Sequence, residues 1–193
     1  MSTLESKSIV SATLMTTSPY QKALFLDRDG IINVDHGYVS AIDDFEFSKG
    51  IFALLECFRN AGYLLFVITN QSGIGRGYYS EEDFHTLTTW MVKTFASKGI
   101  GIEKVFYCPH TPDAKCRCRK PDIGMIEQAL SEYPLDLKHS WMIGDKVSDI
   151  TLAANAGIGN AIYIGDKPLS HATLSFASVN ACARYFQENP GKI

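Results

Sequence analysis

The sequence lacks the features that would place the protein in a membrane or on nucleic acid. No apolar run approaches the roughly 18 to 20 residues that a helix needs to span a bilayer. The chain carries 18 basic and 21 acidic side chains, which gives a formal net charge of -3. Such a balance creates no general attraction to nucleic acid or to anionic lipid, so we expect neither as a partner.

The cysteines are few and unevenly spaced. There are five, and three of them fall between positions 108 and 118. An odd number with such clustering does not indicate a disulfide framework. Reduced thiols are typical of cytoplasmic proteins, in which a cysteine cluster commonly binds a metal, and we expect both here.

The chain has no internal repeat and no linker that would divide it. Its 193 residues, 46% hydrophobic and 20% charged, suit one soluble globular domain with its own core. Residues 1–20 are rich in Ser and Thr, have Lys7 as their basic residue and contain no sustained apolar stretch. They predict a flexible leader instead of a secretory signal, which leaves residues 21–193 as the folded domain.

Short apolar runs alternate with segments whose apolar residues recur at helical spacing. By this criterion we predict strands at 22–26, 64–68, 104–107, 140–143 and 161–164, helices at 51–60, 81–98, 122–133 and 148–156, and a terminal helix within 171–187. The alternation predicts an α/β fold with a doubly wound, mainly parallel sheet and helices on both faces. The longest connections, 31–49 and 109–121, are too short for a large cap domain.

Two carboxylates follow the first predicted strand directly, in the tetrapeptide Asp27-Arg28-Asp29-Gly30. In an open α/β sheet, ligands bind at the carboxyl ends of the strands. A carboxylate pair there can hold a hard cation such as Mg²⁺, or one can attack an electrophile while the other transfers protons. Taken alone, the same tetrapeptide also fits an ordinary solvated turn.

Three further segments place polar side chains at strand ends or before a helix. Thr69 follows the second predicted strand, Asp145 follows the fourth, and Lys120 stands after Arg119 just before a helix. A hydroxyl and exposed amides can grip phosphate oxygens, and adjacent Arg and Lys side chains suit a phosphate as well. Each segment alone could be a helix cap, a polar turn or plain surface.

Together, the acid pair, hydroxyl, lysine and final acid occur in an order that resembles the haloacid dehalogenase superfamily of phosphatases, over about residues 22–166. The resemblance implies that Asp27 is the nucleophile and forms an aspartyl-phosphate. It implies that Asp29 protonates the leaving alcohol and then activates water. It also implies that Thr69 and Lys120 hold the transferring phosphoryl group. Mg²⁺ would be held by Asp27, Asp145 and the backbone carbonyl of Asp29.

The cysteine cluster adds a second predicted metal site. Cys108, His110, Cys116 and Cys118 supply three thiols and one imidazole, which suit a tetrahedral zinc ion. A site with four protein ligands indicates a structural role, with zinc folding the loop 108–118 beside Arg119. Three reduced buried thiols are the alternative. A loop of this kind here resembles the histidinol-phosphatase and heptose bisphosphate phosphatase branch of the superfamily.

Two segments favour the heptose enzymes within that branch. Residues 33–47 and 69–77 look very like the D-glycero-D-manno-heptose 1,7-bisphosphate 7-phosphatases. The resemblance implies an Mg²⁺-dependent enzyme with a sugar phosphate substrate, in nucleotide-activated heptose biosynthesis, working as a monomer. The positions that match substrate contacts are Asp27, Arg28, Asp29, Asp35, His36, Gly37, Tyr38, Thr69, Asn70, Gln71, Ser72, Arg119, Lys120 and Lys146.

Other activities remain as alternatives. The short interval from His110 to Cys116 resembles the histidinol-phosphatase loop, and Ile31 stands where the heptose family usually has Thr. A phosphoacceptor signalling domain also forms an aspartyl-phosphate, but Asp29 favours hydrolysis over a lasting phosphoryl group. A cysteine-based phosphatase is excluded, because no cysteine has an arginine six positions later.

Overall fold

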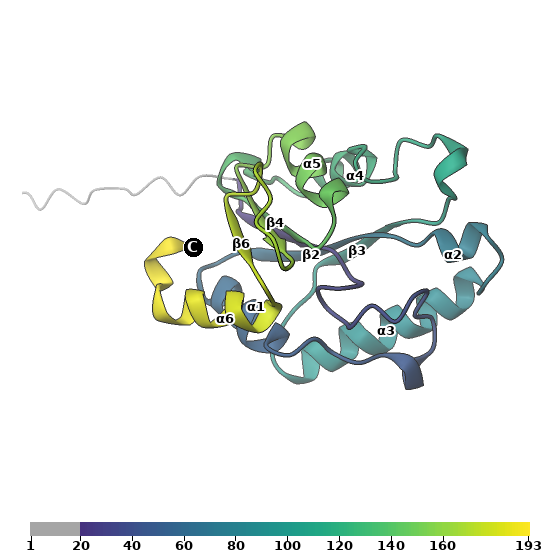
Figure 1. The fold of residues 1–193 in the computed structure, drawn as a ribbon, viewed down its shortest axis with the longest axis horizontal. Helices are drawn as coiled ribbons and strands as arrows, with labels where there is room; N and C mark the ends of the chain where they lie inside the picture. The colour runs from purple at the N-terminus through teal and green to yellow at the C-terminus, as the bar shows by residue number, and fades with distance from the viewer. Residues whose placement is uncertain (1–19) are drawn as a thin grey trace, which may run out of the picture.

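The structure is a computed structural model that describes residues 20–193 (Figure 1). The predicted leader therefore lies outside the described residues, apart from Tyr20. Within the described part of the chain, no helix has the length and apolar character that crossing a membrane requires.

The centre of the molecule is a sheet of six strands in the order β3-β2-β1-β4-β5-β6. All five strand pairings are parallel, as the alternating sequence pattern predicts. The strands are β1 (Ala23–Leu26), β2 (Leu64–Asn70), β3 (Lys104–Cys108), β4 (Trp141–Gly144), β5 (Asn160–Ile164) and β6 (Leu174–Phe176). The order places β1 between β2 and β4, so the chain runs outward from β1 in both directions.

The α-helices are α1 (Ile51–Asn60), α2 (Ser72–Gly75), α3 (Glu81–Ser97), α4 (Gly124–Glu132), α5 (Val147–Ala156) and α6 (Val179–Glu188). Short 3₁₀ turns occupy Ile42–Asp44, Pro112–Ala114, Leu137–His139 and Pro190–Lys192. The start of α3 follows from its sequence. The Ser80 hydroxyl accepts a hydrogen bond from the Asp83 amide, and the Asp83 carboxylate accepts one from the Ser80 amide. This reciprocal pair satisfies amides that have no partner inside the helix.

Two layers of helices cover the sheet, with α1, α3 and α6 on one face and α4 and α5 on the other (Figure 1). Side chains of β1 alternate between the two cores. Leu24 and Leu26 pack in the first core, whereas Ala23 and Phe25 pack in the second. Because all four are fully buried, β1 is fixed from both sides, and so is the segment that follows it.

The terminal helix predicted within residues 171–187 is present, but it occupies only the second part of that segment. The segment forms the edge strand β6 and then α6, which begins after Ser178. Pairing with β5 begins before the strand itself, where the Thr173 amide donates to the Ala161 carbonyl at 2.8 Å. The Ser178 hydroxyl accepts from the Ala181 amide and caps α6. Bonding to the sheet and a capped start thus divide a segment that periodicity alone joins.

Candidate active site

The polar ends of β1, β2 and β4 meet at one edge of the sheet. Asp27 follows β1, Thr69 lies near the end of β2, and Asp145 follows β4. Because these three strands are neighbours, their carboxyl ends form the crevice where the chain changes direction across the sheet. The Asp27 amide donates to the Ile143 carbonyl at 2.9 Å, which ties the end of β1 to β4.

A pocket of about 380 Å³ opens at this edge. Its lining includes most of the residues that the sequence predicts for substrate binding: Asp27, Asp29, Asp35, Gly37, Tyr38, Asn70, Gln71, Ser72, Arg119, Lys120 and Lys146. Tyr79 and Ser148 also line it and were not predicted.

Lys120 is buried between two carboxylates at the base of the pocket. Its Nζ lies 2.9 Å from Asp27 Oδ1 and 2.6 Å from Asp149 Oδ1, and it donates to the Ile68 carbonyl at 2.8 Å. Burial disfavours the ammonium, but the charges of Asp27 and Asp149 raise the pKa of Lys120 above its ordinary value. Lys120 therefore stays positively charged beside Asp27.

Asp149 is a site residue that the sequence analysis did not predict, and at the start of α5 it is also a helix-end charge. It does occupy that position, because its Oδ2 accepts from the Lys146 amide at 3.0 Å. Its other oxygen contacts Lys120, and the side chain is fully buried. One carboxylate thus starts α5 and also orients Lys120.

The acidic groups in the base of the pocket fit a divalent cation. Carboxylate oxygens of Asp27, Asp145 and Asp149 lie within 4.8 Å of one another. Asp145 Oδ1 is buried and has no hydrogen-bond partner among residues 20–193. Burial raises the pKa of Asp27 to about 7, against the opposing effect of Lys120, and raises the pKa of Asp145 to about 6. Three carboxylates facing one lysine leave an excess of negative charge, which suits Mg²⁺ with its preference for oxygen ligands.

Gly30 is required by the close approach of Asp145. Its φ of +88° lies in the left-handed region, and a Cβ added there would stand 2.3 Å from Asp145 Oδ2. Any side chain at position 30 would displace Asp145. The Asp-x-Asp-Gly spacing therefore makes room for the carboxylate from β4 as well as for the turn.

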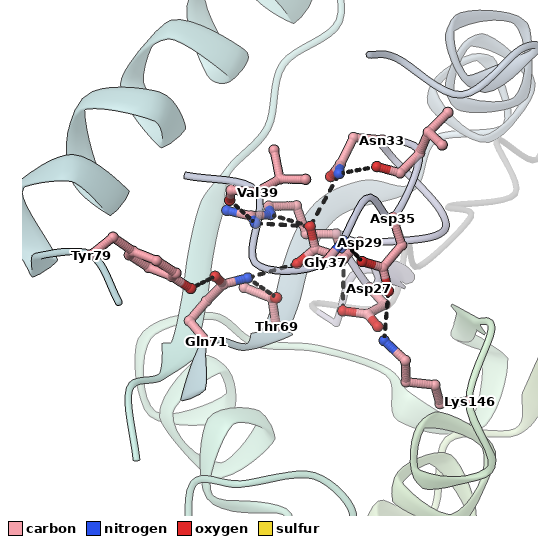
Figure 2. A network of polar contacts seen from close by, with 12 residues as sticks. Asp27, Asp29, Asn33, Asp35, Gly37, Val39, Thr69, Gln71, Tyr79 and Lys146 are labelled. Carbon is pink, nitrogen blue, oxygen red and sulfur yellow. Dashed lines mark hydrogen bonds and ion pairs between the residues drawn. The ribbon is translucent and has the colours of Figure 1, made fainter. Parts of the chain in front are cut away.

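Hydrogen bonds hold both oxygens of the Asp29 carboxylate (Figure 2). Oδ1 accepts from Arg28 Nη2 at 2.8 Å and from Asn33 Nδ2 at 3.1 Å, and Oδ2 accepts from Gln71 Nε2 at 2.9 Å. Arg28 also donates to the Val39 carbonyl at 2.7 Å. The Arg28 side chain is only 1% exposed, so it lies behind the pocket wall. If the strand continued, side-chain alternation would place Arg28 on the side opposite Asp29, but β1 ends at Leu26 and the alternation stops there.

The segment after Asp29 brings further predicted residues to the rim. Asp35 Oδ1 accepts from the Gly37 amide at 3.0 Å, and Asp35 Oδ2 lies 3.4 Å from Lys146 Nζ. This ion pair joins the loop after β1 to the start of α5. His36 does not line the pocket. It faces a neighbouring hollow, 3.6 Å from Glu46.

Two exposed tyrosines stand side by side near the rim. Tyr38 lines the pocket and meets Tyr78 edge to face, with ring centroids 4.7 Å apart. The two side chains are 49% and 60% exposed. An aromatic surface of this kind is available to a ligand at the pocket mouth.

Arg119 and Lys120, the basic side chains predicted to bind phosphate, belong to a segment that Asn70 holds in place by hydrogen bonds. Asn70 Oδ1 accepts from the Lys120 amide at 3.0 Å, and Asn70 Nδ2 donates to the Lys120 carbonyl at 3.3 Å. The Arg119 guanidinium donates to the His110 carbonyl at 3.4 Å. Asn70 therefore docks the end of the cysteine loop against β2.

The four predicted zinc ligands converge at the other end of that loop. The ligand atoms of Cys108, His110, Cys116 and Cys118 all lie within 4.8 Å of one another. The Cys108 and Cys118 sulfurs are 3.1 Å apart, and His110 Nδ1 is 3.3 Å from the Cys118 sulfur. Three sulfurs and one imidazole nitrogen grouped in this way fit a tetrahedral zinc ion.

Comparison with known proteins shows which class of protein has this site. Residues 117–169 match the family model described as HAD-hyrolase-like. The crystal structure of D,D-heptose 1,7-bisphosphate phosphatase from B. bronchiseptica, complexed with magnesium and phosphate, has a TM-score of 0.76 to this structure at 28% identity. That comparison covers 87% of this chain and 99% of the other. The fold and the site thus define a haloacid dehalogenase-like hydrolase.

Two curated relatives identify the family within that class. The chain is 51% identical over 146 residues to D-glycero-alpha-D-manno-heptose-1,7-bisphosphate 7-phosphatase of Campylobacter jejuni, covering 76% of this chain and 84% of that protein. It is 49% identical over 149 residues to D-glycero-beta-D-manno-heptose-1,7-bisphosphate 7-phosphatase of Helicobacter pylori, covering 77% and 86%. The chain belongs to the D-glycero-D-manno-heptose-1,7-bisphosphate 7-phosphatase family, which confirms the resemblance found in the sequence.

Proposed function

We propose that the protein removes the 7-phosphate of D-glycero-D-manno-heptose 1,7-bisphosphate and serves nucleotide-activated heptose biosynthesis. The observation that carries this proposal is the buried Asp27–Lys120 pair beside Asp29, at the end of β1. It occurs in a chain about half identical to two such phosphatases.

The reaction begins with attack on phosphorus by an Asp27 carboxylate oxygen. The P–O bond to C7 breaks as the bond to Asp27 forms, which gives an aspartyl-phosphate and the sugar alcohol. A carboxylate that approaches a phosphate dianion meets like-charge repulsion. Lys120, 2.9 Å from Asp27, offsets this repulsion and stabilises the phosphoryl oxygens in transit.

Asp29 handles the protons of both steps. Its carboxyl group gives a proton to the leaving C7 oxygen, and the resulting carboxylate then takes a proton from water as that water attacks the aspartyl-phosphate. Inorganic phosphate leaves, and Asp27 and Asp29 return to their starting states. Both aspartates line the pocket, so both are open to substrate.

We assign Mg²⁺ to Asp27, Asp145 and the backbone carbonyl of Asp29, with Asp149 as the adjacent carboxylate. When bound, the ion neutralises charge on the phosphoryl oxygens. The buried and unpartnered Asp145 Oδ1 supports this assignment.

The rest of the pocket suits a sugar with a second phosphate. Asp35 and Asn70 offer hydrogen bonds to hydroxyl groups, and Arg119 and Lys146 offer positive charge for the phosphate at C1. All four line the pocket. His36, Arg28 and Thr69, which the resemblance includes among the substrate contacts, do not line the pocket and would need to move to reach that ligand.

The substrate is tested by phosphate release in the presence of Mg²⁺. We expect fast release from heptose 1,7-bisphosphate, assayed as separate α and β anomers because the two relatives differ in the anomer that they are named for. Histidinol phosphate should react much more slowly. Faster release from histidinol phosphate would contradict the proposal and favour the histidinol-phosphatase branch. A stable phosphoprotein without release would favour a signalling domain.

We also propose that zinc occupies the cysteine cluster as a structural ion. Metal analysis of purified protein, never exposed to chelator, should find about one zinc per chain, in keeping with one four-ligand site. Cys118→Ser should reduce that content strongly and lower the melting temperature. Cys57→Ser is the matched control, because Cys57 lies in α1 outside the cluster. Wild-type protein without zinc would refute the assignment.

We propose, finally, that the protein is a cytoplasmic monomer. All five cysteines are free thiols, which supports a reducing compartment.

A further inference from the structure

Gln71 directly follows β2 and lies between two predicted catalytic residues, Asp29 and Thr69 (Figure 2). Its Nε2 donates to Asp29 Oδ2 at 2.9 Å and to Thr69 Oγ1 at 2.8 Å, and its Oε1 accepts from the Tyr79 hydroxyl at 2.6 Å. Both amide hydrogens are therefore used inside the protein. The residue is only 2% exposed. Gln71 is thus poorly placed for the direct substrate contact that the sequence resemblance implies, although it forms part of the pocket wall.

Tyr79 fixes the direction of this amide. Burial raises the pKa of Tyr79 to about 12, despite the opposing effect of Arg28, so the phenol keeps its hydrogen and donates to Oε1. If the amide were rotated by half a turn, its carbonyl oxygen would face the Asp29 carboxylate and no donor would reach Asp29 Oδ2. The phenol therefore keeps the NH₂ group directed at Asp29 and Thr69.

The position of Tyr79 is itself determined by α2. A Cβ added to Gly73 would lie 2.1 Å from Tyr79 Cε1, so the ring occupies space that only a glycine leaves free. The Tyr78 amide also donates to the Gly73 carbonyl at 2.9 Å. These contacts explain physically why Gln71 and Gly73 occur together after β2.

The two oxygens of Asp29 are held by different partners. Oδ1 accepts from Arg28 and Asn33. Within the part of the chain that the structure describes, Gln71 is the hydrogen-bond donor found at Oδ2. Because Oδ1 accepts from two side chains and Oδ2 from one, Oδ2 is the oxygen with a lone pair left for proton transfer.

We propose that Gln71, oriented by Tyr79, is a positioning residue that directs Asp29 Oδ2 for proton transfer. The inference rests on the proposed function, in which Asp29 gives a proton to the leaving oxygen and later takes one from water. The same amide donates to Thr69 Oγ1, so the Thr69 hydroxyl hydrogen does not point at Gln71 and is available to a phosphoryl oxygen. One side chain thus aligns the proton donor with a phosphoryl contact.

The test compares two leaving groups in Gln71→Leu and Tyr79→Phe. Heptose 1,7-bisphosphate releases an alkoxide that needs a proton, whereas p-nitrophenyl phosphate releases a phenolate that does not. For Gln71→Leu we expect kcat on the sugar phosphate to fall about 10²-fold, the low end of a general-acid contribution, with KM nearly unchanged. The pre-steady-state burst of p-nitrophenolate, which reports formation of the aspartyl-phosphate alone, should change by less than about threefold, since proton donation contributes little there. Tyr79→Phe should show the same pattern with a loss of about three- to tenfold, the size expected for one hydrogen bond.

Gln128→Leu is the matched control, because Gln128 is exposed on α4, away from the active-site pocket. Equal losses with both substrates, or a rise in KM without a change in kcat, would overturn the inference. If Gln71→Leu does not fold, Tyr79→Phe decides the question alone. Asp29→Asn in the same assay distinguishes failure of the proposed role of Asp29 from failure of the proposed role of Gln71. An equal loss for both leaving groups in Asp29→Asn would refute the role of Asp29 itself, whereas a selective loss there without one in Gln71→Leu would refute only the role of Gln71.

Discussion

Asp27→Asn is expected to abolish phosphate release while the protein remains folded. The amide is a poor nucleophile, so no aspartyl-phosphate forms, and kcat should fall by on the order of 10⁴-fold or more, as when other catalytic nucleophiles are removed. Lys120 keeps its contact with Asp149 in the variant, so the buried ammonium is still paired. Phosphate release from the heptose bisphosphate and the melting temperature together check this result.

A matched substitution shows that the loss belongs to Asp27. Asp166→Asn also converts an aspartate to an amide, but Asp166 is exposed and lies outside the pocket, so its activity should stay at the wild-type level. Turnover by Asp27→Asn above a tenth of wild type would exclude Asp27 as the nucleophile. Another carboxylate in the pocket would then have to form the covalent bond.

Lys120→Met is expected to lower both stability and activity. The substitution leaves Asp27 and Asp149 buried without their shared cation. Removing one partner of a buried ion pair costs about 3 to 5 kcal/mol, and the free energy of unfolding in urea without added Mg²⁺ should fall by that amount. Phosphate release should be lost as well, because the phosphoryl oxygens lose the positive charge that faces them.

The double variant Lys120→Met/Asp149→Asn separates the two effects. Asp149→Asn removes one of the stranded charges, so part of the lost stability should return, whereas activity should not. Recovery of activity would mean that the lysine only balances Asp149. If Lys120→Met were as stable as wild type, that result would contradict the buried ion pairs of Lys120 with Asp27 and Asp149.

The sequence contains enough information to predict where the site lies. Apolar strands followed by Asp27, Thr69 and Asp145 place these residues at neighbouring strand ends, because a parallel sheet gathers its carboxyl ends on one edge. Lys120 and Arg119 could be predicted as a phosphate-binding pair, but the role of Lys120 on the transferring phosphoryl group could be assigned only through the family resemblance. Its partner Asp149 comes from α5, and their contact depends on how α5 packs, which local spacing does not reveal.

The errors also have physical causes. A three-residue edge strand such as β6 gives almost no periodic signal, and the pairing that stabilises it comes from β5, whose paired residues lie 12 positions earlier and outside the segment. Arg28 turns toward Asp29 because β1 ends before it, so the alternation of side chains no longer applies. Tyr79 has no sequence pattern of its own. Its role depends on the space above Gly73, which only the folded chain shows.

The strand order has a consequence for how the enzyme becomes active. Asp27 follows β1, Thr69 comes from the side of the sheet that contains β2, and Asp145 comes from the opposite side, which contains β4. Neither side alone holds a complete reaction centre. A growing or partly denatured chain would therefore be inactive until the strands on both sides of β1 have assembled with it. The rate at which phosphate release returns during refolding would report the rate of that assembly.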